Sequence, residues 1–120
     1  DINKTLNFCS DHGYDFGMKD DTKNKLDIGW PDLFVEEADS KKHQVFWQKE
    51  YEKHGTCCEN SYNQEQYFNL AMVLKDKFDL LKSFRNYGIF PGGTHTVGKF
   101  NKTIKAITQG FPNLVCTDVM

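Results

Sequence analysis

Residues 46–58 read FWQKEYEKHGTCC and place an acid, a base and an imidazole within one helical turn, directly before two adjacent cysteines. At about 100° per residue, Glu50, Lys53 and His54 fall within an arc of about 100° on an α-helix. The spacing therefore predicts a single polar edge that carries all three groups. Trp47 and Tyr51 form a neighbouring aromatic ridge, which we expect to pack against the core.

This polar edge has the chemistry of an acid–base site. Histidine exchanges protons near neutral pH, and a lysine cation stabilises negative charge that develops on phosphorus. The spacing alone leaves a second interpretation open, because Glu, Lys and His at these intervals also form ordinary solvated helix edges. Zinc binding by His54, Cys57 and Cys58 is a weaker alternative, since no second ligand pair stands at finger-like spacing. We therefore expect neither a metal nor another cofactor.

The bulk composition sets outer limits on the class of protein. The 120 residues suffice for one domain or part of one, and the net charge of −2 gives no general attraction to polyanions, so any such site must be local. We expect no membrane segment, because no apolar run is long enough to span a bilayer. The four cysteines, with the glycosylation sequons at Asn3 and Asn101, favour a secreted protein in an oxidising compartment.

The elements before and around the opening stretch are expected to be helical. Residues 1–29 are polar and turn-rich, which predicts an exposed loop region with one short helix. Pro31 suits the first position of a helix that follows. The next helix is expected from about Gln44 to His54, with Gly55 as a left-handed cap at its end.

The second half of the chain gives a clearer periodic pattern. Asn63 and Gln66 have the spacing of a capping box at the start of a helix. The apolar stripe of this helix, which we expect to lie in the core, consists of Tyr67, Leu70, Ala71, Leu74, Phe78 and Leu81. A further helix is expected at 96–109, burying Val97, Phe100, Ile104 and Ile107 and ending at Gly110. Residues 113–119, NLVCTDV, are compatible with a strand.

The opening string closely resembles the second active-site box of the secreted ribonuclease T2 family, whose plant members include the S-RNases of self-incompatibility. That box reads Phe-Trp, an acidic–aromatic pair and then Lys-His-Gly-Thr-Cys. The likeness extends to TLNFC at 5–9, to YFNLAMVLKDKFDLL at 67–81, which resembles a helix of nightshade-type S-RNases, and to FPNLVC at 111–116. It covers nearly the whole chain.

The resemblance implies an α+β fold, with a central antiparallel sheet and packed helices. Residues 1–120 would be part of a single ribonuclease domain, incomplete at both ends. It also implies an endoribonuclease that cleaves single-stranded RNA without a metal, through a 2′,3′-cyclic phosphate. His54 then matches the general base on the ribose 2′-hydroxyl, and Glu50 and Lys53 match the residues that steady the phosphorane.

Three departures from the family pattern bear on the site. The His-Gly-Leu-Trp-Pro box with the family's other catalytic histidine is absent from these residues, so we expect little activity from them alone. Lys49 stands where many members have histidine; S-RNases often have a basic residue there, which would contact phosphate. Ser40 stands where plant S-RNases often carry a cysteine, which leaves Cys58 without its usual neighbour.

The resemblance also implies disulfides and partners. Cys9 would pair with Cys57, closing a loop that would stabilise the fold by about 4 kcal/mol in the chain-entropy model. Cys116 would pair with a cysteine beyond Met120. Ser10–Lys25 would form an exposed polar loop that sets partner choice.

We expect a monomer that acts in self-pollen rejection and meets a pollen F-box protein. An S-like defence or phosphate-scavenging ribonuclease, or an inactive recognition module, are the alternatives.

Overall fold

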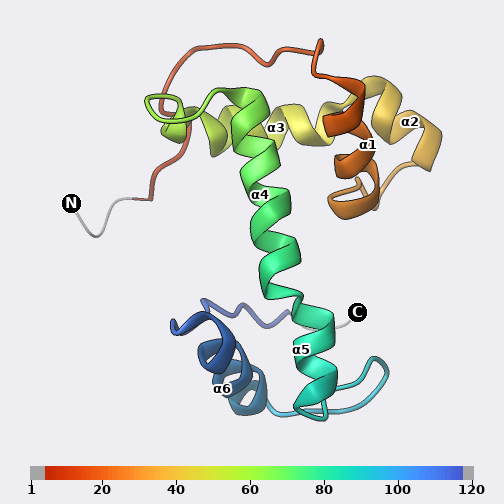
Figure 1. Cartoon of the computed structure of the whole chain (residues 1–120), viewed down its shortest axis with the longest axis vertical. Coiled ribbons are helices and arrows are strands. Elements are labelled where there is room, and N and C mark those ends of the chain that lie inside the picture. The colour runs from red at the N-terminus through yellow and green to blue at the C-terminus, as the bar shows by residue number, and fades with distance from the viewer. Residues whose placement is uncertain (1–4, 118–120) are drawn as a thin grey trace. The chain divides into compact units, whose positions relative to one another are not determined.

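The computed structural model describes residues 5–117, which form helices and connecting loops (Figure 1). The chain divides into two compact units, one up to Leu74 and the other from Lys75 onward. No helix within the described range is long and apolar enough to cross a bilayer. The elements are α1 Asp20–Gly29, α2 Glu37–His43, α3 Val45–Lys53, the 3₁₀ turn η1 Gly55–Cys58, α4 Gln64–Phe78, α5 Leu80–Asn86 and α6 Val97–Thr108.

The expected antiparallel sheet does not appear, because residues 5–117 contain no strand. The described part of the proposed 113–119 strand, up to Thr117, has no regular secondary structure. Its apolar side chains Leu114 and Val115 remain 39% and 81% exposed. A strand is stable only when a neighbour completes its hydrogen-bond ladder and covers one face. Within the described residues no segment does this.

The first unit is built around an aromatic core. Phe68 of α4 is fully buried, and its ring makes contacts with those of Tyr14, Trp30 and Tyr51 at centroid distances of 5.8–6.4 Å. Each large side chain removed from water in this way contributes roughly 1.5–3 kcal/mol. The core therefore joins the N-terminal segment, α1, α3 and α4, and the complete buried cluster is Tyr14, Met18, Leu26, Trp47, Tyr51 and Phe68.

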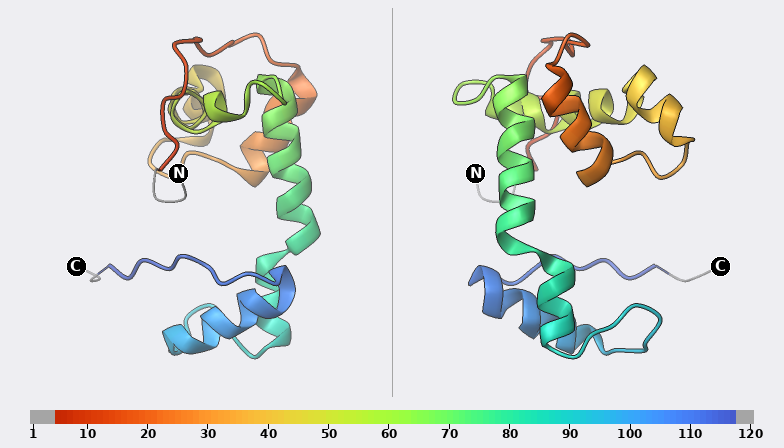
Figure 2. Two further views of the ribbon diagram at one scale, coloured as in Figure 1. Left: turned by 90° about the vertical axis from the view of Figure 1, so that its left-hand side faces the viewer. Right: turned by 45° about the vertical axis from the view of Figure 1, so that its right-hand side comes forward.

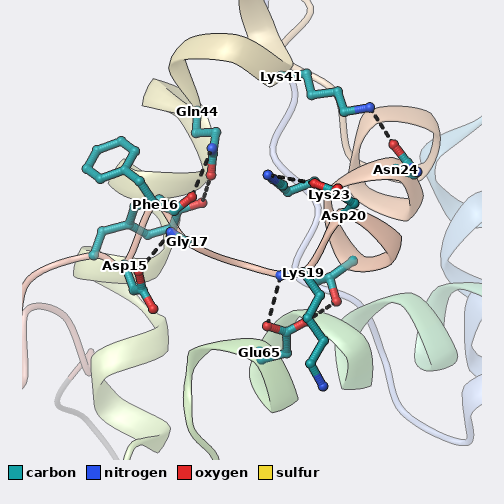
Figure 3. Close-up of polar contacts among 12 residues, drawn as sticks. Asp15, Phe16, Gly17, Lys19, Asp20, Lys23, Asn24, Lys41, Gln44 and Glu65 are labelled. Atoms are coloured by element: carbon teal, nitrogen blue, oxygen red, sulfur yellow. Dashed lines mark hydrogen bonds and ion pairs between the residues drawn. The ribbon is translucent and has the colours of Figure 1, made fainter.

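Polar contacts fix the segment before α1 to the helices (Figure 3). Gln44, between α2 and α3, accepts a hydrogen bond from the Tyr14 hydroxyl at 2.9 Å and donates one to the Phe16 carbonyl at 3.3 Å. Glu65 of α4 accepts hydrogen bonds from the Lys19 N–H and the Thr22 hydroxyl. The expectation of an exposed polar loop at Ser10–Lys25 was therefore only partly right: the segment is anchored by Tyr14, Met18 and Thr22, and α1 occupies its second half.

The predicted start of a helix at Pro31 is wrong. Helix α2 starts only at Glu37, and the residues before it form a turn. The Asp32 carboxylate accepts the N–H of Phe34 at 3.0 Å, a local bond that competes with helix formation. The turn leaves the Phe34 side chain 98% exposed.

Helix α4 begins as the sequence predicts. The Asn63 side chain accepts the N–H of Gln66, and the Gln66 side chain accepts the N–H of Asn63, both at 2.9 Å. The prediction of which face of α4 is buried was wrong. Leu70 and Leu74, predicted to lie in the core, are 36% and 43% exposed, whereas Phe68, which was not included, is fully buried. Helix α4 stops at Phe78, because Asp79 takes a left-handed conformation (φ 25°) and its carboxylate caps α5 by accepting the Lys82 N–H.

In the second unit, α5 and α6 lie side by side (Figure 2). The rings of Phe84 and Phe100 meet edge to face at 5.3 Å. Thr96 caps α6 by accepting the N–H of Lys99, which confirms the start expected at 96. The helix ends at Thr108, one residue before the expected end, and its C-cap Gln109 takes a left-handed conformation. Thr103 is its buried residue, whereas Val97, expected in the core, is 52% exposed.

Candidate active site

Helix α3 brings three of the predicted site residues into its last turn. The helical hydrogen bonding extends to His54, whose N–H donates to the Glu50 carbonyl at 2.9 Å. Glu50 and His54 are half-buried and Lys53 is exposed. None of these three side chains forms a hydrogen bond or ion pair with another residue of the described range. The acid, the base and the imidazole thus share the last turn of α3.

The aromatic ridge of α3, which lies beside the polar edge, anchors this turn in the core as the sequence predicts. Trp47 is 1% exposed, and its indole N–H donates to the Trp30 carbonyl at 2.8 Å. Tyr51 is 5% exposed and packs against Tyr67 and Phe68. Burial raises the pKa of the Tyr51 phenol above its ordinary value, so the hydroxyl stays protonated at neutral pH.

Gly55 lets the chain turn sharply after His54, but not as the predicted left-handed cap. It starts the turn η1, and it is not among the residues with positive φ. A Cβ atom built on Gly55 would lie 2.2 Å from Cδ2 of Tyr51, so only glycine fits against this ring. The glycine is therefore required by close packing rather than by backbone conformation.

The N-terminal segment holds this turn from the other side; it is the red trace that passes the end of α3 in Figure 1. Cys9 is joined to Cys57 by a disulfide. The Phe8 N–H donates to the Lys53 carbonyl at 2.7 Å, and the Cys9 N–H donates to the Thr56 hydroxyl at 3.2 Å. Consecutive residues of one segment therefore fasten the chain on both sides of His54.

Lys49 lies at the rim of a groove between α2 and α3. This groove has a volume of about 590 Å³ and is lined by Asp32, Phe34, Val35, Asp39, Ser40, His43, Val45, Phe46 and Lys49. Lys49 is exposed and, within the described residues, makes no polar contact through its side chain. An apolar hollow with an aromatic wall and a cation at its edge can accept a flat ring attached to an anion. The groove does not follow from the sequence, because the turn that forms one of its walls replaces the helix predicted over residues 31–36.

The other histidines are not part of this turn. His12 is paired with Glu59, with 2.9 Å between Nδ1 and Oε2. His43 lies 3.8 Å from Asp39 across the surface of α2. His95 accepts the N–H of Phe90 through Nε2 at 3.2 Å. Each of these three side chains already has a partner within the protein.

The zinc alternative conflicts with the disulfide, because Cys57 is bonded to Cys9 and has no thiolate to offer. Among the residues described, no three His, Cys, Asp or Glu side chains gather around a metal-sized site. Cys58 and Cys116 are exposed and unpaired within this chain. The pairing of Cys116 with a cysteine outside it stays a prediction.

Glycosylation at Asn3 and at Asn101 also stays a prediction. Asn3 lies outside the described residues. Asn101 lies on α6 and is half-buried, and the threonine of its sequon, Thr103, is 2% exposed with its hydroxyl donating to the Lys99 carbonyl.

Comparisons with known proteins identify the family of this chain. The model of the ribonuclease T2 family matches residues 1–119. Ribonuclease S-6 of Nicotiana alata is 56% identical over 117 residues, covering 97% of this chain and 54% of that protein. The chain therefore belongs to the ribonuclease T2 family. It spans about half the length of the curated relatives it matches.

Solved structures show the same fold. The crystal structure of the Nicotiana alata SF11-RNase, described as associated with gametophytic self-incompatibility, aligns with a TM-score of 0.90 at 35% identity, covering 98% of this chain and 60% of that one. Ribonuclease MC1 from bitter gourd seeds aligns with a TM-score of 0.76 at 26% identity, covering 92% of this chain and 56% of that one. The described residues thus have the fold of the corresponding part of a T2 ribonuclease.

Proposed function

We propose that this chain supplies the half of a ribonuclease active site that contains the general base, in a secreted plant S-RNase. The observation that carries the proposal is the turn in which Glu50, Lys53 and His54 lie together, fixed by the core behind it and by the Cys9–Cys57 disulfide beside it. Family membership gives this turn its chemistry. The sheet of the α+β fold would be formed by residues corresponding to the part of the relatives that this chain does not span.

The reaction is transphosphorylation within RNA. His54 accepts the proton of the ribose 2′-hydroxyl, whose oxygen then bonds to the adjacent phosphorus. The bond from phosphorus to the 5′-oxygen breaks, and that oxygen receives a proton from a second acid. The products are a 2′,3′-cyclic phosphate and a free 5′-hydroxyl. The Lys53 ammonium stabilises the negative charge of the phosphorane between these steps. Glu50 lies beside it and takes the role of the matching family residue.

Lys49 and the groove beside it would hold the substrate. The Lys49 ammonium contacts a phosphate, and the base that follows lies in the groove against Phe34 and Phe46. Single-stranded RNA suits such a site, because its bases are free to leave a stack and pack on aromatic rings. A duplex would keep its bases out of the groove.

The second acid is assigned to the histidine of the family's first active-site box, which these residues lack. The test compares the full-length gene product with the 120-residue chain, both acting on single-stranded RNA with EDTA present. We expect the full-length protein to release cyclic phosphate, detectable by phosphorus NMR, and the shorter chain to be slower by a factor of at least about 10². Equal rates would show that the catalytic pair is misassigned, and the absence of cyclic product would refute the nuclease proposal.

The similarity to Nicotiana S-RNases favours a role in self-incompatibility over the S-like defence or phosphate-scavenging alternative. In that role the protein is a secreted, glycosylated monomer that meets a pollen F-box protein through surface such as the exposed residues of Ser10–Lys25. Expression of the full-length protein in styles of a compatible plant tests this. Rejection of one pollen genotype is expected, whereas unchanged acceptance of all pollen would favour the S-like alternative.

A further inference from the structure

Thr56 is the buried polar residue closest in sequence to His54 on the side of the turn η1. Its side chain is 2% exposed. The hydroxyl donates to the Glu52 carbonyl at 2.9 Å and accepts the Cys9 N–H at 3.2 Å. One oxygen atom therefore joins the last turn of α3, the turn η1 and the N-terminal segment.

The first of these bonds spans His54 in the chain. Glu52 lies two residues before His54 and Thr56 lies two residues after it. The hydrogen bond between them therefore constrains the main chain on both sides of His54. The neighbouring disulfide between Cys9 and Cys57 joins the same segments, but its several rotatable bonds limit distance more than orientation. The hydrogen bonds to Thr56 add the directional constraint, because they weaken steeply when their angles change.

We propose that the Thr56 hydroxyl is a positioning group for His54 in catalysis. This inference rests on the proposed function, in which the imidazole takes the proton from the 2′-hydroxyl. Thr56 touches no substrate and acts only by holding the backbone on both sides of His54. A misplacement of about 1 Å in a catalytic group can cost about 10²-fold in rate, so the loss of this constraint is expected in kcat rather than in KM.

The experiment uses the full-length gene product and single-stranded RNA. Thr56→Val keeps the shape and branching of the side chain but removes the hydroxyl, and Thr56→Ser keeps the hydroxyl. Thr22→Val is the matched control. Thr22 is also buried, at 3% exposed, and its hydroxyl donates to Glu65, which lies on α4 and not at the site. Activity is expressed per folded protein, well below each melting temperature.

We expect Thr56→Val to lose about 10- to 100-fold in kcat, with KM changed by less than about twofold. Thr56→Ser should recover kcat to within about threefold, and Thr22→Val should melt earlier with kcat unchanged within about twofold. A spectroscopic readout is independent of activity: in Thr56→Val the NMR signals of the His54 ring should shift or split, while those of His95 stay in place.

The outcomes separate this inference from the function on which it rests. If the unmodified protein cleaves RNA and Thr56→Val matches it in kcat, the positioning role is refuted and the nuclease proposal stands. If the unmodified protein is inactive, the nuclease proposal fails and the inference fails with it. If Thr56→Val does not fold, Thr56→Ser decides: a folded Ser variant that has lost more than about tenfold in kcat contradicts a role for the hydroxyl.

Discussion

The ring of Tyr51 leaves no room for a side chain at position 55, so only glycine fits where the chain passes from α3 into η1. Tyr51 cannot move aside freely, because it packs against Tyr67 and Phe68 in the core. The pair illustrates what sequence can and cannot reveal at the scale of a residue. A glycine after a helix predicts a chain turn, but its packing against a ring four residues earlier is a tertiary contact with no local signal.

Gly55→Ala is therefore expected to destabilise the protein. The new Cβ would lie 2.2 Å from Cδ2 and 2.7 Å from Cε2 of Tyr51, and overpacking of this kind costs about 1–3 kcal/mol. Urea unfolding measures the loss. Gly13→Ala is the control, since a Cβ there meets nothing within 4 Å. Equal stability of the two variants would contradict the close fit.

The surface pair of His12 and Glu59 makes stability depend on pH. The hydrogen bond to Glu59 raises the pKa of His12 above its ordinary value of 6.5, and bonds from His12 and Ser10 lower the pKa of Glu59 below 4.5. The histidine's contribution is fully present below pH 6.5 and is lost as pH rises through its raised pKa. The glutamate's contribution is present above pH 4.5 and is lost as pH falls through its lowered pKa.

His12→Gln should therefore lower the melting temperature more at about pH 5.5 than at about pH 8. The effect is expected to be small, because the His12 side chain is 81% exposed and the pair is screened by water. Calorimetry at low and high salt provides the check, and the difference at about pH 5.5 should shrink with added salt. A variant that melts identically to the unmodified protein at both pH values would argue against the pair.

At the scale of elements, α4 shows how far local rules extend. Its start follows from the capping box of Asn63 and Gln66, which needs only neighbouring residues. Its buried face does not follow from periodicity, because the core is formed by rings of α3 and of the N-terminal segment around Phe68. The helix misplaced at Pro31 failed for a related reason: the Asx-type bond of Asp32 competed with the helix there.

The capping box predicts the effect of Asn63→Ala. The substitution removes the side-chain acceptor of the Gln66 N–H, and loss of such a cap costs about 1 kcal/mol. Asn63→Ser keeps an acceptor and should lie within a few tenths of a kcal/mol of the unmodified protein. Urea midpoints of the three proteins measure the difference. A Ser variant as unstable as the Ala variant would show that the side-chain cap has no role.

At the scale of the whole molecule, residues 5–117 form helices and loops and have the fold of the corresponding part of a T2 ribonuclease. The resemblance, carried by four segments of the sequence, identified the family, and helical spacing placed Glu50 and Lys53 on α3 with His54 at its end. It could not show that these residues lack a sheet, because pairing of strands depends on chain segments far apart in sequence. Nor could it show the groove beside Lys49, which exists because a turn replaces a helix.

The central claim is that His54 carries a proton in RNA cleavage. The most direct measurement is kcat/KM of the full-length gene product with His54→Ala, on single-stranded RNA with EDTA. His95→Gln, in the unit from Lys75 onward, is the control and should retain its rate. We expect His54→Ala to lose at least about 10²- to 10⁴-fold while folding normally. A loss below about tenfold would contradict the claim.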